Sequence, residues 1–330
     1  MPIRVAFVGS GGMANAHTGA MEGMKNVKFA GFCDVNQERG KALADKYGAP
    51  FFTDPEKMIQ AVAPQAVWVL LPPFAHGAAE MACVKHKVPF FVEKPINRDL
   101  KQAQEIAAAA DKAKLLTCAG YMNRYRKGIN LARQMLQKDP AVYVQGGWIG
   151  GSPPRKATSP IGSWWVQKKL SGGQFVEQVT HTVDLVRFLC GDAVEVAAFA
   201  ANGFNSGIEN YDIDDAMAVS IKFATGGVAT LHSCCASNAK SGVTLTVFAK
   251  KCAFDFTGWN HDTNVYVPGK EPKVVAGEGN IFTIEDKAFL KAVQTGDASG
   301  IKSSYADAVK TLAITIAANE SAATGKVIKL

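Results

Sequence analysis

The sequence lacks the patterns that mark a membrane protein or a secreted protein. No apolar run approaches the roughly 20 residues that a membrane-spanning helix needs. The first residues, 1–7, lack the charged, apolar and small-residue layout of a signal peptide, so we expect none. The seven cysteines are odd in number, show no C-x-x-C spacing and lie mostly in apolar surroundings. We therefore expect buried free thiols and a cytoplasmic protein.

Patterns for metal ions and nucleic acids are missing as well. The six histidines show no His-Glu-x-x-His or similar spacing, so we expect no metal site. The net charge is +7, but the basic residues are scattered, with only doublets such as Lys168-Lys169. Because nucleic-acid-binding proteins gather basic residues in a patch or stripe, we expect no nucleic acid partner. The mild positive balance suits an anionic ligand.

The overall composition is typical of a globular protein, with 48% hydrophobic and 20% charged residues. A chain of 330 residues is too long for one ordinary core, and we expect two domains, residues 1–121 and 122–330. Strands and helices alternate in the first, which predicts an α/β fold with a doubly wound parallel sheet. The terminal helices of the second domain can pack back on the first.

The second domain has a different pattern. After a helix at residues 127–137, weakly alternating strands predict an α+β domain with a large, mainly antiparallel open sheet. An open sheet face needs a cover, and the simple hypothesis is a homodimer or homotetramer formed through it.

A glycine-rich loop follows the first predicted strand. Residues 9–14 read G-x-G-x-x-A, directly between the apolar run 3–8 and a helical stretch. Such a loop turns tightly, lets the backbone approach a pyrophosphate, and presents the N–H groups at the helix start. Asp34 ends the next strand, 20 residues after Ala14, where a carboxylate binds the adenosine ribose. Arg39 lies farther on, so the pattern favours NAD over NADP. The expected cofactor contacts here are Gly9, Gly11, Gly12, Met13 and Asp34.

Two further strands carry polar groups to their carboxyl ends, where ligands bind in open α/β sheets. One ends at Leu71 and is followed by Pro73 and His76, and the other ends in Glu93-Lys94-Pro95. We expect both strand ends to border the cofactor, through Leu71, Pro73, His76, Glu93 and Lys94. The alternative for Glu93-Lys94 is a solvated surface pair, and the alternative for His76 is a surface histidine at a helix start. We expect a cis Lys94–Pro95 peptide bond.

A helix predicted over residues 175–189 carries a polar stripe. Glu177, His181 and Asp184 are spaced i, i+4 and i+7 and share one helical face, while the other side is apolar. The stripe is either a solvated surface or a general acid–base histidine oriented by carboxylates. The ordinary histidine pKa of about 6.5 suits proton transfer near neutral pH.

Taken together, the motifs Gly9-x-Gly11-x-x-Ala14, Glu93-Lys94-Pro95 and Gly172-Gly173-x-x-x-Glu177-x-x-x-His181 resemble the Gfo/Idh/MocA family of oxidoreductases. The resemblance covers essentially the whole chain. It implies an N-terminal Rossmann domain, and a C-terminal sheet that shapes the substrate pocket and forms the oligomer interface. It also implies hydride transfer between nicotinamide and a sugar, polyol or related carbinol. Glu177 stands where inositol dehydrogenases usually carry aspartate, which argues against inositol itself.

By motif position, Lys94 and His181 match the catalytic pair of the family. We expect His181 to take the hydroxyl proton, Lys94 to stabilise the developing oxyanion, and Glu177 to orient one of them. The reverse assignment, with lysine as the base, stays open. Two other functions fit the fold: a glycosidase that oxidises its sugar transiently, and a regulator that senses the cofactor without turnover. Candidate substrate contacts are Tyr121, Arg124, Trp164, Trp165 and Asp184, although the tryptophans also fit a domain core.

Overall fold

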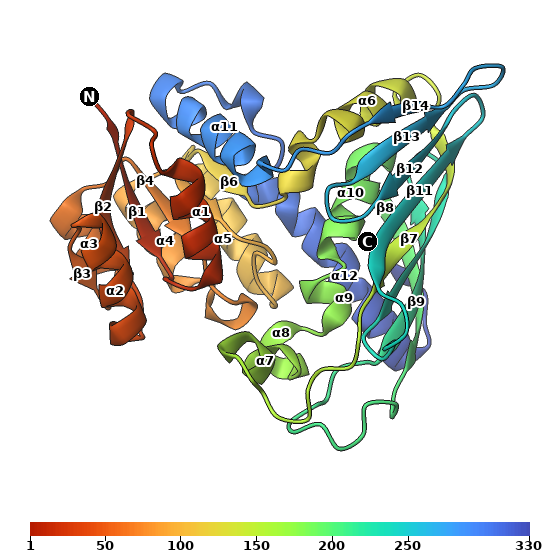
Figure 1. Ribbon diagram of the computed structural model, residues 1–330, viewed down its shortest axis with the longest axis horizontal. Coiled ribbons are helices and arrows are strands. Elements are labelled where there is room, and N and C mark those ends of the chain that lie inside the picture. Colours follow the sequence, from red (N-terminus) through yellow and green to blue (C-terminus); the bar gives the residue numbers. More distant parts are fainter. The chain divides into compact units, whose positions relative to one another are not determined.

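The computed structural model, shown in Figure 1, describes residues 1–159 and 161–330. It forms two compact units, which are described in turn. The first contains residues 1–122 and 280–309, and the second contains residues 123–279 and 310–330. The C-terminal part of the chain therefore contributes residues 280–309 to the first unit and residues 310–330 to the second.

The first unit is built on a six-stranded sheet in the order β3-β2-β1-β4-β5-β6, in which every pair is parallel. This is the expected doubly wound sheet, and its strand order reverses between β1 and β4. The strands are β1 (Ile3–Val8), β2 (Val27–Cys33), β3 (Phe51–Phe52), β4 (Ala66–Val69), β5 (Phe90–Val92) and β6 (Thr117–Ala119). The helices are α1 (Gly12–Met21), α2 (Gln37–Tyr47), α3 (Pro55–Val62), η1 (Pro73–Ala75), α4 (Ala78–His86), α5 (Leu100–Lys112), α11 (Ile281–Thr295) and η3 (Ala298–Gly300).

Aromatic side chains form the centre of this unit. Phe7 stacks on Phe32 and on Trp68, and Trp68 stacks on Phe91. Phe289 of α11 meets Trp68 edge to face with ring centroids 5.1 Å apart. These large buried rings explain the near-continuous apolar runs of the strands, and they tie α11 into the same core.

A glycine determines where helix α4 begins. One interpretation of the sequence placed His76 at a helix start, but the structure has the short η1 before His76, and α4 begins only at Ala78. Gly77 separates them with a φ of +128°, a backbone conformation that a residue with a side chain rarely adopts. The break places His76 in the turn after β4 rather than inside a helix.

The second unit contains a nine-stranded sheet in the order β14-β13-β12-β11-β7-β10-β9-β8-β15. Only the pair of β7 and β10 is parallel among the pairings within residues 123–159 and 161–330, so the sheet is mainly antiparallel, as expected. The strands are β7 (Ala141–Ile149), β8 (Ala193–Ala201), β9 (Ala216–Phe223), β10 (Val228–Cys234), β11 (Gly242–Ala249), β12 (Ala253–Thr257), β13 (Asp262–Tyr266), β14 (Lys273–Val275) and β15 (Ile328–Lys329). The helices are α6 (Lys127–Leu136), α7 (Pro160–Trp165), α8 (Lys168–Ser171), α9 (Gln174–Glu177) and α10 (Thr180–Cys190), with η2 (Met122–Tyr125) before them and α12 (Tyr305–Thr324) entering from the first unit.

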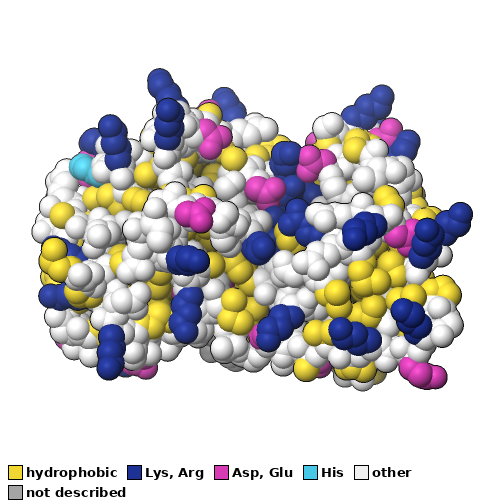
Figure 2. Space-filling view, turned by 90° about the horizontal axis from the view of Figure 1, so that it is seen from above, with side chains coloured by type: hydrophobic (Ala, Val, Ile, Leu, Met, Phe, Trp, Pro, Cys, Tyr) yellow, Lys and Arg dark blue, Asp and Glu magenta, His cyan; other side chains and the backbone are white. Residues whose placement is uncertain are grey.

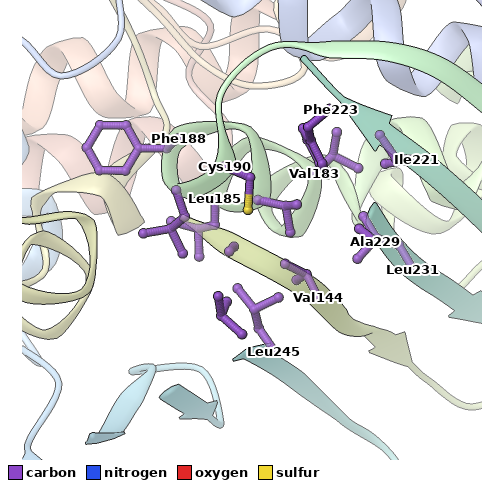
Figure 3. Packing of buried hydrophobic residues seen from close by; sticks show 14 of the residues in the cluster. Val144, Val183, Leu185, Phe188, Cys190, Ile221, Phe223, Ala229, Leu231 and Leu245 are labelled. Atoms are coloured by element: carbon purple, nitrogen blue, oxygen red, sulfur yellow. The ribbon is translucent and has the colours of Figure 1, made fainter. Parts of the chain in front are cut away.

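Helix α10 covers one face of this sheet. Figure 3 shows its apolar side chains, including Val183 and Leu185, packed over residues such as Val144, Leu231 and Leu245 of the strands. Along β9 and β10 buried and less buried residues alternate, because successive side chains point to opposite faces. The outward face retains large exposed apolar side chains, among them Phe199 and Phe248.

No helix in the described part of the chain combines the length and the apolar character that crossing a membrane requires. Among the described residues, no group of three or more His, Cys, Asp or Glu is placed to hold a metal ion. On the face seen in Figure 2, lysine and arginine side chains are dispersed among apolar and uncharged ones.

Candidate active site

The glycine-rich loop of the first unit leaves room beside the start of α1. Gly9 has a φ of +94°, and a Cβ there would lie 2.2 Å from the Leu70 carbonyl oxygen, so only glycine fits. A Cβ at Gly11 or Gly12 would meet nothing within 4 Å. No side chain caps the N-terminus of α1, and the Ser10 hydroxyl oxygen is buried with no hydrogen-bond partner among the described residues. Unpaired N–H groups, an unpartnered buried hydroxyl and open space fit the pyrophosphate of a dinucleotide.

Asp34 is buried at the end of β2 and is held from three sides. Its carboxylate accepts hydrogen bonds from the N–H groups of Ser10 at 2.7 Å and Asn36 at 2.8 Å. Arg39, in the first turn of α2, reaches back and forms a two-pronged ion pair with it, at 2.8 to 3.1 Å. In the sequence Arg39 appeared too distant to matter, but the helix start at Gln37 turns its side chain toward Asp34. A cation therefore lies beside the carboxylate that is expected to bind the ribose.

We predict that Arg39 supports use of NADP. Replacing Arg39 with alanine should lower kcat/KM with NADP about tenfold, the effect of losing one hydrogen bond to a charged group, and change kcat/KM with NAD little. Steady-state kinetics with both cofactors measure the ratio, and Lys41→Ala, an exposed change on the same helix, is the control. An equal loss with both cofactors would contradict this role.

The turn after β4 contains the other expected cofactor contacts. Leu71 is partly buried, and Pro73 and His76 are buried. His76 Nδ1 lies 2.6 Å from the carboxylate of Glu80, which also accepts the N–H of Gly77 at 2.7 Å. His76 is thus held in the interior and is not the surface histidine of the alternative interpretation. Its Nε2 has no hydrogen-bond partner among the described residues.

Glu93 and Lys94 leave the carboxyl end of β5 with different environments. Glu93 is buried, whereas Lys94 is partly exposed, and the Lys94–Pro95 peptide bond is cis as expected. One carboxylate oxygen of Glu93 accepts the Lys94 backbone N–H at 2.9 Å, and the other lies 3.1 Å from His17 Nε2. Since Glu93 is inside the protein, a solvated surface pair does not describe this stretch.

In the second unit the expected helix 175–189 is divided. Glu177 lies on α9, and His181 and Asp184 lie on α10, with residues 178 and 179 between the two helices. Glu177 accepts a hydrogen bond from the indole of Trp165 at 3.1 Å. His181 is the one residue of α10 that is not fully buried. The stripe is therefore not a solvated surface: its first two members are partly buried, and Asp184 is buried.

Asp184 and Arg124, both expected among the substrate contacts, bind each other. The guanidinium donates to both carboxylate oxygens at 2.6 and 2.7 Å, and the two side chains, Arg124 and Asp184, are 3% and 1% exposed. Thr311 donates to the same carboxylate at 3.0 Å, and Arg124 also lies over the ring of Phe188. These contacts fasten α10 to η2 and α12.

We predict that Asp184→Asn destabilises the protein by about 3–5 kcal/mol, because it leaves the buried guanidinium of Arg124 without its counter-charge. Urea unfolding followed by circular dichroism measures this change. The control is Asp192→Asn, which removes a carboxylate paired with Arg187 and Lys310 but about half exposed. A loss for Asp184→Asn no larger than for the control would contradict the structural role.

The remaining substrate candidates differ in burial. Trp165 is nearly buried and packs with Val166, Ile213 and Cys235, whereas Trp164 packs at the edge of that cluster and is partly exposed. Tyr121 is buried. Trp165 thus packs in the core of its unit and also donates a hydrogen bond to the Glu177 carboxylate.

Sequence reasoning missed a buried pair in the first unit. His17 of α1 lies between Glu93 and Asp286 of α11, and Trp68 donates its indole N–H to Asp286 at 3.0 Å. The available signal was a histidine on the apolar side of the helix that follows the glycine loop.

Known protein families match the sequence of each unit. A sequence model described as oxidoreductase family, NAD-binding Rossmann fold, matches residues 3–121, and one described as GFO/IDH/MocA C-terminal domain matches residues 140–255. Myo-inositol 2-dehydrogenase of Thermotoga maritima is 24% identical over 58% of this chain and 56% of its own length. This chain thus matches little more than half of that relative. D-glucoside 3-dehydrogenase of Escherichia coli is 24% identical over 74% of each chain.

Solved structures share the whole fold. Levoglucosan dehydrogenase in complex with NADH and levoglucosan superimposes with a TM-score of 0.87 at 19% identity, over 100% of this chain and 99% of its own. The models of the N-terminal and the C-terminal domain of one family thus match in that order along the chain. The solved structure named above has the same fold. The chain belongs to the Gfo/Idh/MocA family of oxidoreductases, and its first unit contains the NAD-binding Rossmann fold of that family.

Proposed function

We propose that this protein is a dehydrogenase that transfers a hydride between nicotinamide and a hydroxyl carbon of a sugar, polyol or sugar derivative. The observation that carries the proposal is the fixed Glu93-Lys94 stretch at the carboxyl end of β5 in an NAD-binding unit. The similar proteins named above are dehydrogenases of myo-inositol, a D-glucoside and levoglucosan, which supports a carbohydrate substrate. NAD is the main cofactor, with NADP as the weaker one.

Lys94 and His181 form the proposed catalytic pair. When bound, the cofactor supplies the acceptor for the hydride. A ring nitrogen of His181 accepts the proton of the substrate hydroxyl, and the Lys94 ammonium stabilises the negative charge that develops on the oxygen. Glu177, steadied by Trp165, orients one member of the pair. Lys94 as the base is the alternative assignment within the same reaction.

The positions of the residues support the following proposed cofactor and substrate contacts. We assign Gly9, Gly11, Gly12 and Met13 to the pyrophosphate, because a Cβ at Gly11 or Gly12 would meet nothing within 4 Å, and Asp34 to the ribose. We assign Leu71, Pro73, His76, Glu93 and Lys94 to the nicotinamide end, because they follow β4, which borders the switch point of the sheet, and its neighbour β5. Trp164 is the proposed apolar contact for a sugar ring. For Arg124 and Asp184 we propose a structural role that supports the site, because their side chains form an ion pair with each other.

A substrate screen tests the proposal. The purified protein is incubated with sugars, polyols, anhydrosugars and glycosides, each with NAD and with NADP, and absorbance at the NADH wavelength is followed together with product analysis. Reduction of NAD by a carbohydrate is the expected result. Release of a sugar or aglycone without net NADH would identify the glycosidase instead, and NAD binding without turnover across the panel would identify the regulator.

We also propose that the outward face of the nine-stranded sheet pairs with a second copy of the chain. Phe199 is 81% exposed there and Phe248 is 39% exposed. Large apolar side chains exposed together on a surface typically mark an interaction site. Light scattering should give at least twice the monomer mass, and Phe199→Glu should reduce it. A clean monomer for the unchanged protein would contradict this proposal. We also propose a cytoplasmic location for the protein.

A further inference from the structure

A chain of buried polar groups in the first unit joins three segments that are far apart in the sequence. His17 lies on α1, Asp286 on α11, and Glu93 directly after β5. His17 Nδ1 is 2.8 Å from one Asp286 carboxylate oxygen, and His17 Nε2 is 3.1 Å from a Glu93 carboxylate oxygen. All three side chains are 5% exposed or less. Burial of this kind is costly unless each group is paired, so the contacts are specific.

The geometry favours a charged histidine between two ionised carboxylates. Each ring nitrogen faces a carboxylate oxygen, and a neutral imidazole has only one N–H to donate. Both nitrogens can donate only when the ring carries two protons. Burial by itself lowers the pKa of His17, but the facing carboxylates of Asp286 and Glu93 outweigh it and raise the pKa to about 10. The other acid of α11 in this region, Glu285, is also buried.

Contacts other than those with His17 also hold the two carboxylates in place. Asp286 accepts the indole N–H of Trp68 in β4, which orients it toward His17. The rings of Phe91 and Phe282 lie edge-on to the imidazole at 5.0 and 5.3 Å. A Cβ at Gly120 would lie 3.0 Å from a Glu93 carboxylate oxygen, so Glu93 has little room to turn. Its second oxygen accepts the backbone N–H of Lys94 at 2.9 Å.

We propose that His17, held by Asp286, is a positioning residue for the proposed reaction: it fixes the Glu93 carboxylate, and Glu93 fixes the backbone from which Lys94 extends. The inference rests on the proposed function of Lys94. It adds two residues, His17 and Asp286, that contact neither substrate nor the reacting atoms. A stored orientation of this kind matters because displacing a catalytic group by about 1 Å can cost about a hundredfold in rate.

The test compares His17→Gln with the double variant His17→Gln/Asp286→Asn. In the single variant the new glutamine amide can donate one hydrogen bond to Glu93, but its carbonyl oxygen then faces the Asp286 carboxylate with no proton between them. In the double variant the new asparagine amide can donate to that carbonyl oxygen, which restores an unbroken chain of hydrogen bonds to the Glu93 carboxylate. We expect kcat to fall about 10²-fold in His17→Gln, and to return to within about tenfold of the unchanged protein in the double variant.

Rates are expressed per NAD-binding site, counted by fluorescence titration, so that a loss of folded protein does not count as a loss of kcat. His86→Gln, a partly exposed histidine on α4, is the control and should keep the normal rate. Asp286→Asn alone serves as a second probe, with an expected loss between those of the other variants. Normal kcat per site in His17→Gln, or no recovery in the double variant, would overturn the inference.

Lys94→Met separates this inference from the proposed function. If Lys94→Met keeps full activity, the role of Lys94 is wrong and the positioning role is wrong with it. If Lys94→Met is inactive while His17→Gln has a normal rate, only the positioning role is wrong.

Discussion

Replacing His181 with alanine should lower kcat about 10²- to 10⁴-fold and leave NAD affinity nearly unchanged, because the variant loses the group that accepts the hydroxyl proton. The change is local. His181 is the least buried residue of α10, and the apolar side chains that pack this helix on the sheet are retained. Alanine also has the highest helix propensity, so the helix itself is not weakened.

Stopped-flow mixing with the substrate found in the screen gives the rate of NADH formation, and fluorescence titration gives the NAD dissociation constant. His232→Ala is a matched control, since His232 is a partly buried histidine of the same unit on β10. It should keep the normal rate. Full activity of His181→Ala on that substrate would show that another group takes the proton.

Replacing Lys94 with methionine should lower kcat about 10²- to 10³-fold, the usual effect of removing one group that stabilises a developing oxyanion. Methionine keeps a similar length and removes the charge. The backbone N–H that binds Glu93 is unchanged, so the turn after β5 should keep its conformation. A modest loss of NAD affinity is expected as well, because Lys94 is also a proposed cofactor contact.

The same kinetic measurements apply, with Lys101→Met, an exposed lysine on α5, as the control. Lys94→Arg refines the result: a cation at this position should recover part of the rate if charge alone matters. Equal kcat for Lys94→Met and the unchanged protein would exclude the proposed role of Lys94.

Much of the first unit follows from local sequence patterns. The apolar run before Gly9, the glycine loop and the acid at Asp34 lie within one strand–helix–strand segment, so their spacing alone fixes their arrangement. The strands that deliver Leu71 and Glu93 were predicted for the same reason. Each is a short apolar run closed by proline, and parallel strands of one sheet end at the same edge.

Features that depend on distant contacts were not predictable in this way. His17 and Asp286 are 269 positions apart, and only the return of α11 to the first unit brings them together. Arg39 was not expected near the ribose because it lies five positions after Asp34. The first turn of α2 brings its side chain back to that carboxylate. For Asp184 the solvated interpretation stayed open, because the helical pattern does not reveal that Arg124, 60 positions earlier, neutralises it inside the protein.

The edges of the second sheet show the same limit. Strand β14 is three residues long and β15 is two, too short for an alternating pattern, and each exists because a neighbouring strand pairs with it. The division between α9 and α10 likewise left no mark in the spacing of Glu177 and His181.

The most direct test of the central claim follows one hydrogen atom. The substrate from the screen is prepared with deuterium on the carbon that bears the reacting hydroxyl, and the reduced nucleotide is analysed by mass spectrometry. The account predicts one deuterium in each molecule of NADH formed, and about 10²-fold less labelled NADH, or a still larger drop, when His181→Ala or Lys94→Met replaces the enzyme for the same short time. Deuterium released to water, or NADH without deuterium, would contradict direct hydride transfer from that carbon.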